Sequence, residues 1–448
     1  METLKAGYVA FGTGFYVPEN LAAITDKAEK QLTDAGIELI HTDPVVMLGQ
    51  EERAIHDLKA SSWDFLIANV INWIDPRAAS RILYEFRDRP ILLYSNGGFT
   101  EGDTLISPAA GAGSTALRYP LERWNVKFKY LYNGPDMPMD VAGILKFGRA
   151  AQVMRKLRTA RLGLVGFNDM GLYTTGFNVT RLRGLIGPEV ESIDMLQLDR
   201  KMDELDSKAV KDEVKRVTKR WVYPLGKPKD QVIERAVRMY MATVEFCKEK
   251  KFDAISYKCV EGIALCMNAV HSVPSSLVAS AGYPYVDEND VGNLTAELML
   301  KWLSGEQVTF LEHYEHHPEW ILLGVDGFIP DQLIDGNPQI KSIATVLLDG
   351  IANCSRMITG RLTLACLSED DEGYRMHIVT GEGKSPPQWV EMGVPLPSWP
   401  SVKFYPDGSV RNILDHVQSQ HFAAVFGDYA DELLDLCYLL DIRPVVDR

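Results

Sequence analysis

Residues 65–94 have the sequence FLIANVINWIDPRAASRILYEFRDRPILLY, and this stretch decides the fold. Two short apolar runs, 65–70 and 91–94, enclose an amphipathic segment at 76–86. This order predicts a strand, a helix and a second strand that lies parallel to the first. We therefore expect a parallel sheet with helices covering both of its faces.

The same alternation extends in both directions along the first third of the chain. Further strands are predicted at 7–11, 37–40 and 127–132. Further helices are predicted at 21–35, 51–60 and 116–123. Together these segments predict an N-terminal α/β domain over residues 1–140.

A second α/β domain is predicted over residues 141–330, and beyond it strand-like runs no longer alternate with predicted helices. Strands at 161–167 and 252–257 alternate with helices at 175–185, 231–250 and 291–303. Beyond residue 330, runs at 343–347, 361–366 and 374–379 are strand-like and are joined by polar turns. The expected fold is two Rossmann-like, parallel-sheet α/β domains followed by an antiparallel β-rich, barrel-like domain over residues 331–448.

Composition excludes several classes of protein. The chain has 448 residues, with 47 basic and 61 acidic side chains and a net charge of -14. An excess of acid argues against non-specific binding to nucleic acid or to an anionic membrane. No transmembrane run or signal peptide is recognisable, and the six cysteines include no CxxC pair. We expect a cytoplasmic protein with reduced thiols.

The histidine-rich segment 311–317, LEHYEHH, is the densest group of metal-ligand side chains in the sequence. Successive residues of a strand face opposite sides, so Glu312 and His313 cannot point the same way. On this pattern Glu312, Tyr314 and His316 share one face. One ligand from this segment is therefore plausible and three are not expected, and the alternative for His313, His316 and His317 is the polar edge of a loop.

Two further candidates lie elsewhere in the sequence. Glu288 belongs to the acidic run 286–290, VDEND, just before an apolar helix, and His421 begins an apolar strand-like run. Acidic and Asn residues at a helix start usually cap it, and we expect that role for Asp287, Asn289 and Asp290. A single histidine at a strand start is more often structural than a ligand.

Taken together, three blocks of the chain resemble the superfamily of L-fucose and L-arabinose isomerases, which are metal-dependent aldose–ketose isomerases. The first block is 11–19, FGTGFYVPE, after the first strand. The second is Glu288-Asn289-Asp290, an apolar helix, Leu303-Ser304-Gly305 and Phe310-Leu311-Glu312. The third is Gln420-His421, Phe426-Gly427-Asp428 and a closing Ile442, Pro444-Val445 run.

The resemblance implies that Glu288, Glu312 and His421 hold one divalent ion, which we expect to be Mn²⁺. The two glutamates would also be catalytic, moving a proton between C1 and C2 of the sugar through a cis-enediol. Arabinose isomerases carry a further acid and a further histidine. Asp326 is the nearest acid here, but its surroundings do not match, so the three-ligand, fucose-type site fits better.

Substrate contacts are expected at Gln420, Phe15, Tyr16 and Trp73. Gln420 precedes the metal histidine, and aromatic faces stack on sugars, although ordinary packing is the alternative for the three aromatic residues. Divergence outside the metal block favours a non-standard sugar. An anionic hexose, such as a sulfonated one, would need a cation, for which the candidates are Lys258, Arg356 and Arg361. The resemblance also implies a homo-oligomer, trimeric or hexameric.

Two alternatives remain at this stage. A cytoplasmic sugar-binding or regulatory protein of the same fold would bind a sugar without turnover. A nucleotide-dependent dehydrogenase would use the glycine-bearing turn 163–171, although its spacing departs from the GxGxxG pattern of dinucleotide sites.

Overall fold

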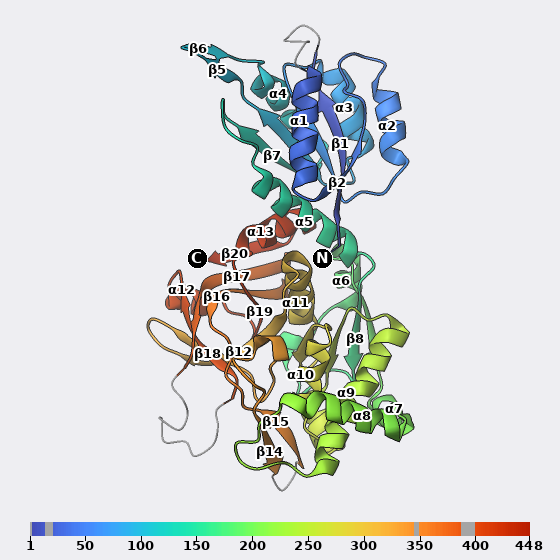
Figure 1. Cartoon of the computed structure of the whole chain (residues 1–448), viewed down its shortest axis with the longest axis vertical. Helices are drawn as coiled ribbons and strands as arrows, with labels where there is room; N and C mark the ends of the chain where they lie inside the picture. Colours follow the sequence, from blue (N-terminus) through green and yellow to red (C-terminus); the bar gives the residue numbers. More distant parts are fainter. Residues whose placement is uncertain (1, 14–20, 345–348, 387–398) are drawn as a thin grey trace. The chain divides into compact units, whose positions relative to one another are not determined.

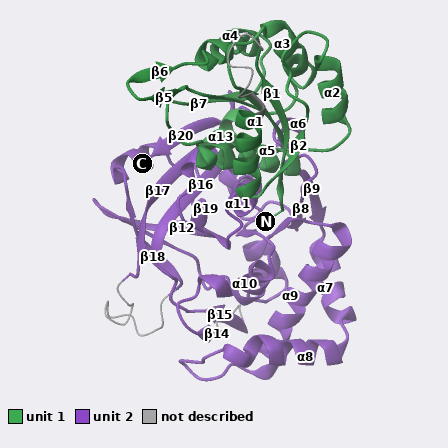
Figure 2. Cartoon of the chain, turned by 45° about the horizontal axis from the view of Figure 1, so that its top comes forward, with its two compact units in different colours: residues 1–156, 434–439 green, residues 157–433, 440–448 purple. Residues whose placement is uncertain are grey.

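The computed structural model describes residues 2–13, 21–344, 349–386 and 399–448. The chain divides into two compact units: residues 1–156 with 434–439 form unit 1, and residues 157–433 with 440–448 form unit 2 (Figure 2). Among the described residues, no helix is long and apolar enough to cross a lipid bilayer.

Unit 1 is built on a five-stranded sheet with the strand order β2-β1-β3-β4-β7, in which every pairing is parallel (Figure 1). Its strands are β1 (Leu4–Phe11), β2 (Ile37–His41), β3 (Phe65–Val70), β4 (Ile91–Asn96) and β7 (Phe128–Asn133). Its helices are α1 (Leu21–Asp34), α2 (Glu51–Lys59), α3 (Pro76–Glu85), α4 (Ala110–Arg123) and most of α5 (Val141–Leu157), and a small hairpin comprises β5 (Phe99–Glu101) and β6 (Thr104–Ile106). Every residue of β3 is buried, as a parallel strand covered on both faces must be.

Helix α3 shows why the sequence folds locally as it does. Asp75 caps the helix by accepting a hydrogen bond from the backbone N–H of Arg77, at 3.0 Å. Pro76 occupies the first turn, where its fixed φ suits a helix and its missing N–H costs nothing. Buried apolar residues then recur at helical spacing and join the core of unit 1.

The first part of unit 2 is a second parallel sheet, with the order β11-β10-β8-β9. Its strands are β8 (Arg161–Val165), β9 (Glu189–Ile193), β10 (Ala254–Tyr257) and β11 (Tyr285–Asp287). Its α-helices are α6 (Val179–Leu185), α7 (Met195–Glu204), α8 (Ser207–Val217), α9 (Asp230–Lys250), α10 (Ser272–Ser280) and α11 (Val291–Ser304). Shorter helical turns are η2 (Tyr173–Thr175), η3 (Thr218–Arg220) and the π-helical η4 (Cys259–Cys266).

The rest of unit 2 is a closed β-barrel with the strand order β16-β19-β12-β13-β18-β17-β20. The ring closes because β17 also pairs with β16, and β20 alone adds in parallel. The strands are β12 (Val308–His316), β13 (Ile321–Gly324), β16 (Gly360–Asp370), β17 (Gly373–Lys384), β18 (Ser401–Pro406), β19 (His421–Phe426) and β20 (Arg443–Asp447). Accompanying elements are η5 (Asp331–Leu333), the hairpin β14 (Ile340–Ala344) and β15 (Asp349–Asn353), and α12 (Val410–His416). Helix α13 (Ala430–Leu440) is divided, since its residues 434–439 belong to unit 1.

The predicted fold class is confirmed, with two parallel α/β sheets and a C-terminal antiparallel barrel. The helix predicted over 175–185 is instead two pieces, η2 and α6, because Asn178 caps α6 by accepting from the N–H of Arg181. Strands β12 and β13 lie before residue 330, yet they belong to the barrel. The division into domains 1–140, 141–330 and 331–448 stays a prediction.

Candidate active site

Glu288 lies at the carboxyl end of β11, the edge at which parallel α/β sheets usually bind their ligands. Glu288 and the next residue, Asn289, have positive φ angles of 61° and 53°. This left-handed conformation is costly for residues other than glycine. The turn is held by the Asn289 side chain, whose Nδ2 donates to the carbonyl oxygens of Val165 and Phe167 at 3.2 and 2.7 Å. Strained backbone fixed by buried bonds is typical of functional sites.

Glu312 and His421 come from neighbouring strands of the barrel. Strand β12 pairs antiparallel with β19, and Glu312 lies directly opposite His421. Directly opposite residues share a face of the sheet. Beyond His313 the pairing of β12 with β13 shifts register, and His313 Nδ1 lies 3.0 Å from His316 Nε2. The strict alternation expected for this segment therefore fails after His313, and His316 lies beside His313.

His421 lies between the two glutamates. It is fully buried, and its Nδ1 lies 2.9 Å from Oδ2 of Asp290. Its Nε2 lies 3.5 Å from Oε2 of Glu288 and 3.8 Å from Oε1 of Glu312. Both separations exceed ordinary hydrogen-bond lengths, and within the described residues this nitrogen has no hydrogen-bond partner.

These side chains fit a divalent cation. A buried imidazole nitrogen without a partner is costly, and two carboxylates beside it add negative charge that a cation would offset. Carboxylate and imidazole together are ligands that Mn²⁺ and similar ions accept. Asp290 completes the pattern, because metal-binding histidines usually give their other nitrogen to a carboxylate.

The pKa values of Glu288 and Glu312 are both raised, because the two carboxylates are buried and lie near other acids. Burial raises the pKa of Glu288, although His421 partly offsets the effect. Burial raises the pKa of Glu312 to about 7, again against the influence of His421, and the nearby Asp287 adds to the rise. Burial likewise raises the pKa of Asp326 to about 6. The acids of this site therefore hold their charge at a cost that a bound cation would reduce.

Gln420 joins the site to the helical turn η2. Its Nε2 donates to Oε2 of Glu288 at 2.9 Å, and its Oε1 accepts from Oγ1 of Thr174 at 2.9 Å. Gln420 therefore holds the Glu288 carboxylate in place through its side-chain amide. Nothing in the sequence pattern around Thr174 indicated this contact.

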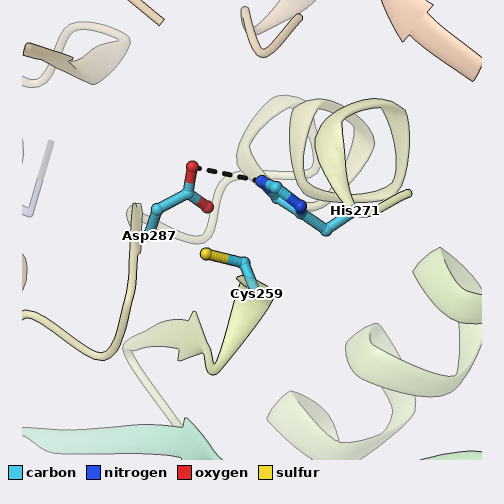
Figure 3. A group of neighbouring side chains, drawn as sticks. All are labelled: Cys259, His271 and Asp287. Carbon is cyan, nitrogen blue, oxygen red and sulfur yellow. Dashed lines mark hydrogen bonds and ion pairs between the residues drawn. The ribbon is translucent and has the colours of Figure 1, made fainter. Parts of the chain in front are cut away.

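Of the three residues expected to cap α11, only Asp290 does so. It accepts from the N–H of Asn293 at 2.9 Å. The expectation was wrong for Asp287, which is buried in a cluster with Cys259 and His271 (Figure 3). Its carboxylate accepts a hydrogen bond from the Tyr285 hydroxyl, and its Oδ2 lies 3.2 Å from Nε2 of His271. Asp287 therefore does not cap α11, because its carboxylate interacts with Tyr285, two residues before it, and with His271, 16 residues before it.

The remaining predicted substrate contacts lie in unit 1. Phe15 and Tyr16 fall outside the described residues. Trp73 follows β3 and is 40% exposed. Their contact with substrate stays a prediction.

The three candidate cations differ in their partners. Lys258 follows β10, and its Nζ lies 2.9 Å from the carbonyl oxygen of Asn168 and 2.7 Å from Glu261. Arg361 pairs with both Asp407 and Asp428. Arg356 donates to the Ser385 hydroxyl at 3.0 Å. Of the three, Lys258 lies on the carboxyl edge of the sheet that carries Glu288.

Comparison with known proteins gives a full-length likeness. No protein-family model matches the chain. The chain is 20% identical to the sulfoquinovose isomerases of Priestia aryabhattai and of Priestia megaterium, in alignments that cover all of each protein. It is also 20% identical to the sulfoquinovose isomerase of Alkalicoccus urumqiensis, over 75% of each chain.

Proposed function

We propose that this chain is a metal-dependent aldose–ketose isomerase that acts on a sulfonated hexose. The observation that carries the proposal is the buried Nε2 of His421, which has no hydrogen-bond partner among the described residues and faces Glu288 and Glu312. The full-length similarity to sulfoquinovose isomerases supports both the reaction and the sulfonated substrate.

Glu288, Glu312 and His421 would hold one divalent cation, which we propose is Mn²⁺. When bound, it supplies Lewis-acid chemistry by polarising the sugar oxygens at C1 and C2. Asp290 keeps the imidazole oriented, because its carboxylate binds Nδ1 and leaves Nε2 facing the two glutamates.

The two glutamates are the catalytic residues of this proposal. One carboxylate accepts the proton from C2 of the open-chain aldose, and the other returns a proton to C1, with a cis-enediol between the two steps. The C2–H bond breaks, a C1–H bond forms and a hydroxyl proton moves from O2 to O1. Aldose and ketose therefore have the same composition, and no oxidant is required. Gln420 is placed to hold the Glu288 carboxylate and to contact a sugar hydroxyl.

The direct test is interconversion of a sulfonated hexose by metal-stripped protein with and without added Mn²⁺. We expect sulfoquinovose to convert to its ketose only when Mn²⁺ is present. Glu312→Gln should abolish conversion, whereas Glu315→Gln on the same strand should not, because the Glu315 side chain is exposed and paired with His317. Binding of sulfoquinovose without conversion would contradict the proposal and favour the sugar-binding protein.

Lys258 is the proposed contact for the sulfonate. In the pairing of β10 with β11, Tyr257 lies opposite Asp287, so Lys258 and Glu288 follow matched positions on neighbouring strands. Its partner Glu261 has a side chain that is 46% exposed, so an anionic substrate group can replace it. Arg361, by contrast, is already held by two carboxylates.

Lys258→Met should lower kcat/KM for sulfoquinovose about 10- to 100-fold, the loss expected for a charged hydrogen bond. The same variant should leave conversion of D-glucose, the matched neutral hexose, unchanged or improved. Arg356→Met is the control and should change neither. Equal losses for the sulfonated and the neutral sugar would contradict the assignment of Lys258.

We also propose that the enzyme works in the cytoplasm as a homo-oligomer, a trimer or hexamer, as its resemblance to fucose and arabinose isomerases implies. Light scattering on the purified protein tests the assembly. A monomer at micromolar concentration would contradict it.

A further inference from the structure

Cys259, His271 and Asp287 form a cluster that the proposed isomerase chemistry does not use (Figure 3). Cys259 begins the π-helical turn after β10, Asp287 ends β11, and His271 lies at the N-terminus of α10. One ligand atom from each lies within 4.8 Å of the others, and all three residues are buried. Three separate elements therefore bring a thiol, an imidazole and a carboxylate together.

The surroundings of this cluster are acidic. Asp287 belongs to the cluster, and Glu288 follows it directly in the sequence. The Cys259 thiol donates a hydrogen bond to Oδ2 of Asp169, which lies 3.7 Å from Sγ. A cation bound here would offset these carboxylates and favour the thiolate.

A second cluster comprises His377, His416 and Asp447. Its ligand atoms also lie within 4.8 Å of one another, but its surroundings differ. Both imidazoles already hold hydrogen bonds to Asp447 Oδ2, at 2.8 and 2.9 Å. The Arg375 guanidinium donates to the carbonyl oxygen of His416, so a positive charge is already present there. Nδ1 of His377 has no hydrogen-bond partner among the described residues, but this cluster lacks the thiol that distinguishes the Cys259 cluster.

We propose that Cys259, His271 and Asp287 form a second metal site, selective for a thiophilic divalent ion of the Zn²⁺ class. Thiolate and imidazole ligands favour Zn²⁺, Co²⁺ and Cd²⁺, whereas Mn²⁺ prefers oxygen-rich sites such as Glu288 and Glu312. Binding releases the thiol proton to solvent and forms a bond from Sγ to the ion. The Tyr285 hydroxyl donates to Oδ1 of Asp287, whereas Oδ2 lies 3.2 Å from His271 Nε2, and an ion bound by both of these atoms would replace their contact.

Occupancy of this site has a consequence for the isomerase that rests on the proposed function. Asp287 immediately precedes Glu288, and its charge also reaches Glu312. A second divalent ion here adds positive charge beside the Mn²⁺ ligands and weakens Mn²⁺ binding by repulsion. Zn²⁺ should therefore inhibit turnover at a fixed Mn²⁺ concentration, and Cys259→Ser should relieve that inhibition.

The binding test uses Co²⁺ as the probe and does not depend on turnover. Metal-stripped full-length protein titrated with Co²⁺ should develop a near-ultraviolet thiolate-to-cobalt charge-transfer band. Cys259→Ser and His271→Gln should each lose this band while their circular dichroism remains that of the folded protein. Cys266→Ser, which alters the exposed cysteine of the same helical turn, should keep it. His421→Ala should also keep it, which separates this site from the proposed Mn²⁺ site.

Two results would overturn the proposal. One is the absence of a charge-transfer band in the wild-type protein at saturating Co²⁺. The other is a band that survives in Cys259→Ser but disappears in Cys266→Ser, which would assign the thiolate to the surface cysteine.

Discussion

The carboxyl edges of the two parallel sheets differ in chemistry although the sheets share an architecture. In unit 1, the N–H of Thr13 donates to Oδ1 of Asn72 at 2.8 Å, and Nδ2 of Asn72 donates back to the carbonyl of Thr13 at 3.1 Å. Both groups are uncharged, and they satisfy one another. In unit 2, Glu288 follows a left-handed turn and faces an imidazole nitrogen that has no hydrogen-bond partner among the described residues.

This difference shows that the fold alone does not indicate which sheet edge carries the candidate site. Layers of strands and helices recur in both units, whereas unsatisfied buried charge and strained backbone occur together at the edge that carries Glu288. The barrel supplies what the parallel sheet lacks, since Glu312 and His421 come from β12 and β19. The variants below change one edge at a time.

The largest effect is expected for His421→Ala. Loss of the imidazole should abolish tight Mn²⁺ binding and lower kcat by about 10³-fold, the several kcal/mol that a Lewis acid supplies. The control in unit 1 is Asn69→Ala, which removes the hydrogen bond from Nδ2 of Asn69 to the Tyr8 hydroxyl. That change should cost about 1–3 kcal/mol of unfolding free energy and leave the kcat of the folded protein unchanged. The account fails if both variants lose turnover alike.

A smaller effect is expected for Asp290→Asn. Asparagine can still accept from the N–H of Asn293 and cap α11, so the start of the helix should persist. It replaces the charged partner of His421 Nδ1 with a neutral one, so Mn²⁺ affinity should fall about 10- to 100-fold. Asp194→Asn is the matched control, because Asp194 caps α7 through the N–H of Leu196 and has no histidine partner in the described part of the chain. Isothermal titration with Mn²⁺ measures the affinity of each variant, and equal affinities would contradict this prediction.

Metal removal should change stability by a few kcal/mol. Mn²⁺ at about 100 times its Kd should raise the free energy of unfolding by about 2.7 kcal/mol over the stripped protein. Thermal or urea unfolding with and without Mn²⁺ measures this gain. Glu312→Gln should gain less, because one carboxylate ligand is gone. Identical unfolding of the wild-type protein in both conditions would speak against the cation site.

The smallest effect concerns the strained turn after β11. Asn289→Ala and Asn289→Gly both remove the hydrogen bonds to Val165 and Phe167, but only glycine tolerates a φ of 53° without strain. The glycine variant should therefore be more stable than the alanine variant by about 1 kcal/mol in urea unfolding. Equal stability would mean that the turn relaxes and that the backbone at Glu288 is not strained.

Much of the fold was predictable because its signals are local. Strand β3 (Phe65–Val70) matches the predicted range because it is a largely apolar run that begins directly after Asp64 and is followed within two residues by Asn72. Helix α9 (Asp230–Lys250) begins within one residue of its predicted start, because its apolar residues recur at helical spacing. The break between η2 and α6 was missed, because it depends on a cap at Asn178 rather than on hydrophobic periodicity.

The site was predictable only in part. Glu288, Glu312 and His421 were singled out through resemblance, and the structure brings them together, while their roles stay predictions. The buried position of Asp287 could not be predicted from the sequence, because its partner His271 is 16 residues away and lies in no recognisable motif. The register shift in β12 was likewise hidden, since a bulge changes the facing of residues without changing composition.

Metal-dependent proton exchange tests the central claim most directly. Metal-stripped protein would be incubated with sulfoquinovose in D₂O, with and without Mn²⁺, and the C1 and C2 positions followed by NMR. The account predicts deuterium at these carbons only when Mn²⁺ is present, and none with Glu312→Gln. Absence of exchange in the wild-type protein that has bound both Mn²⁺ and sulfoquinovose would contradict it.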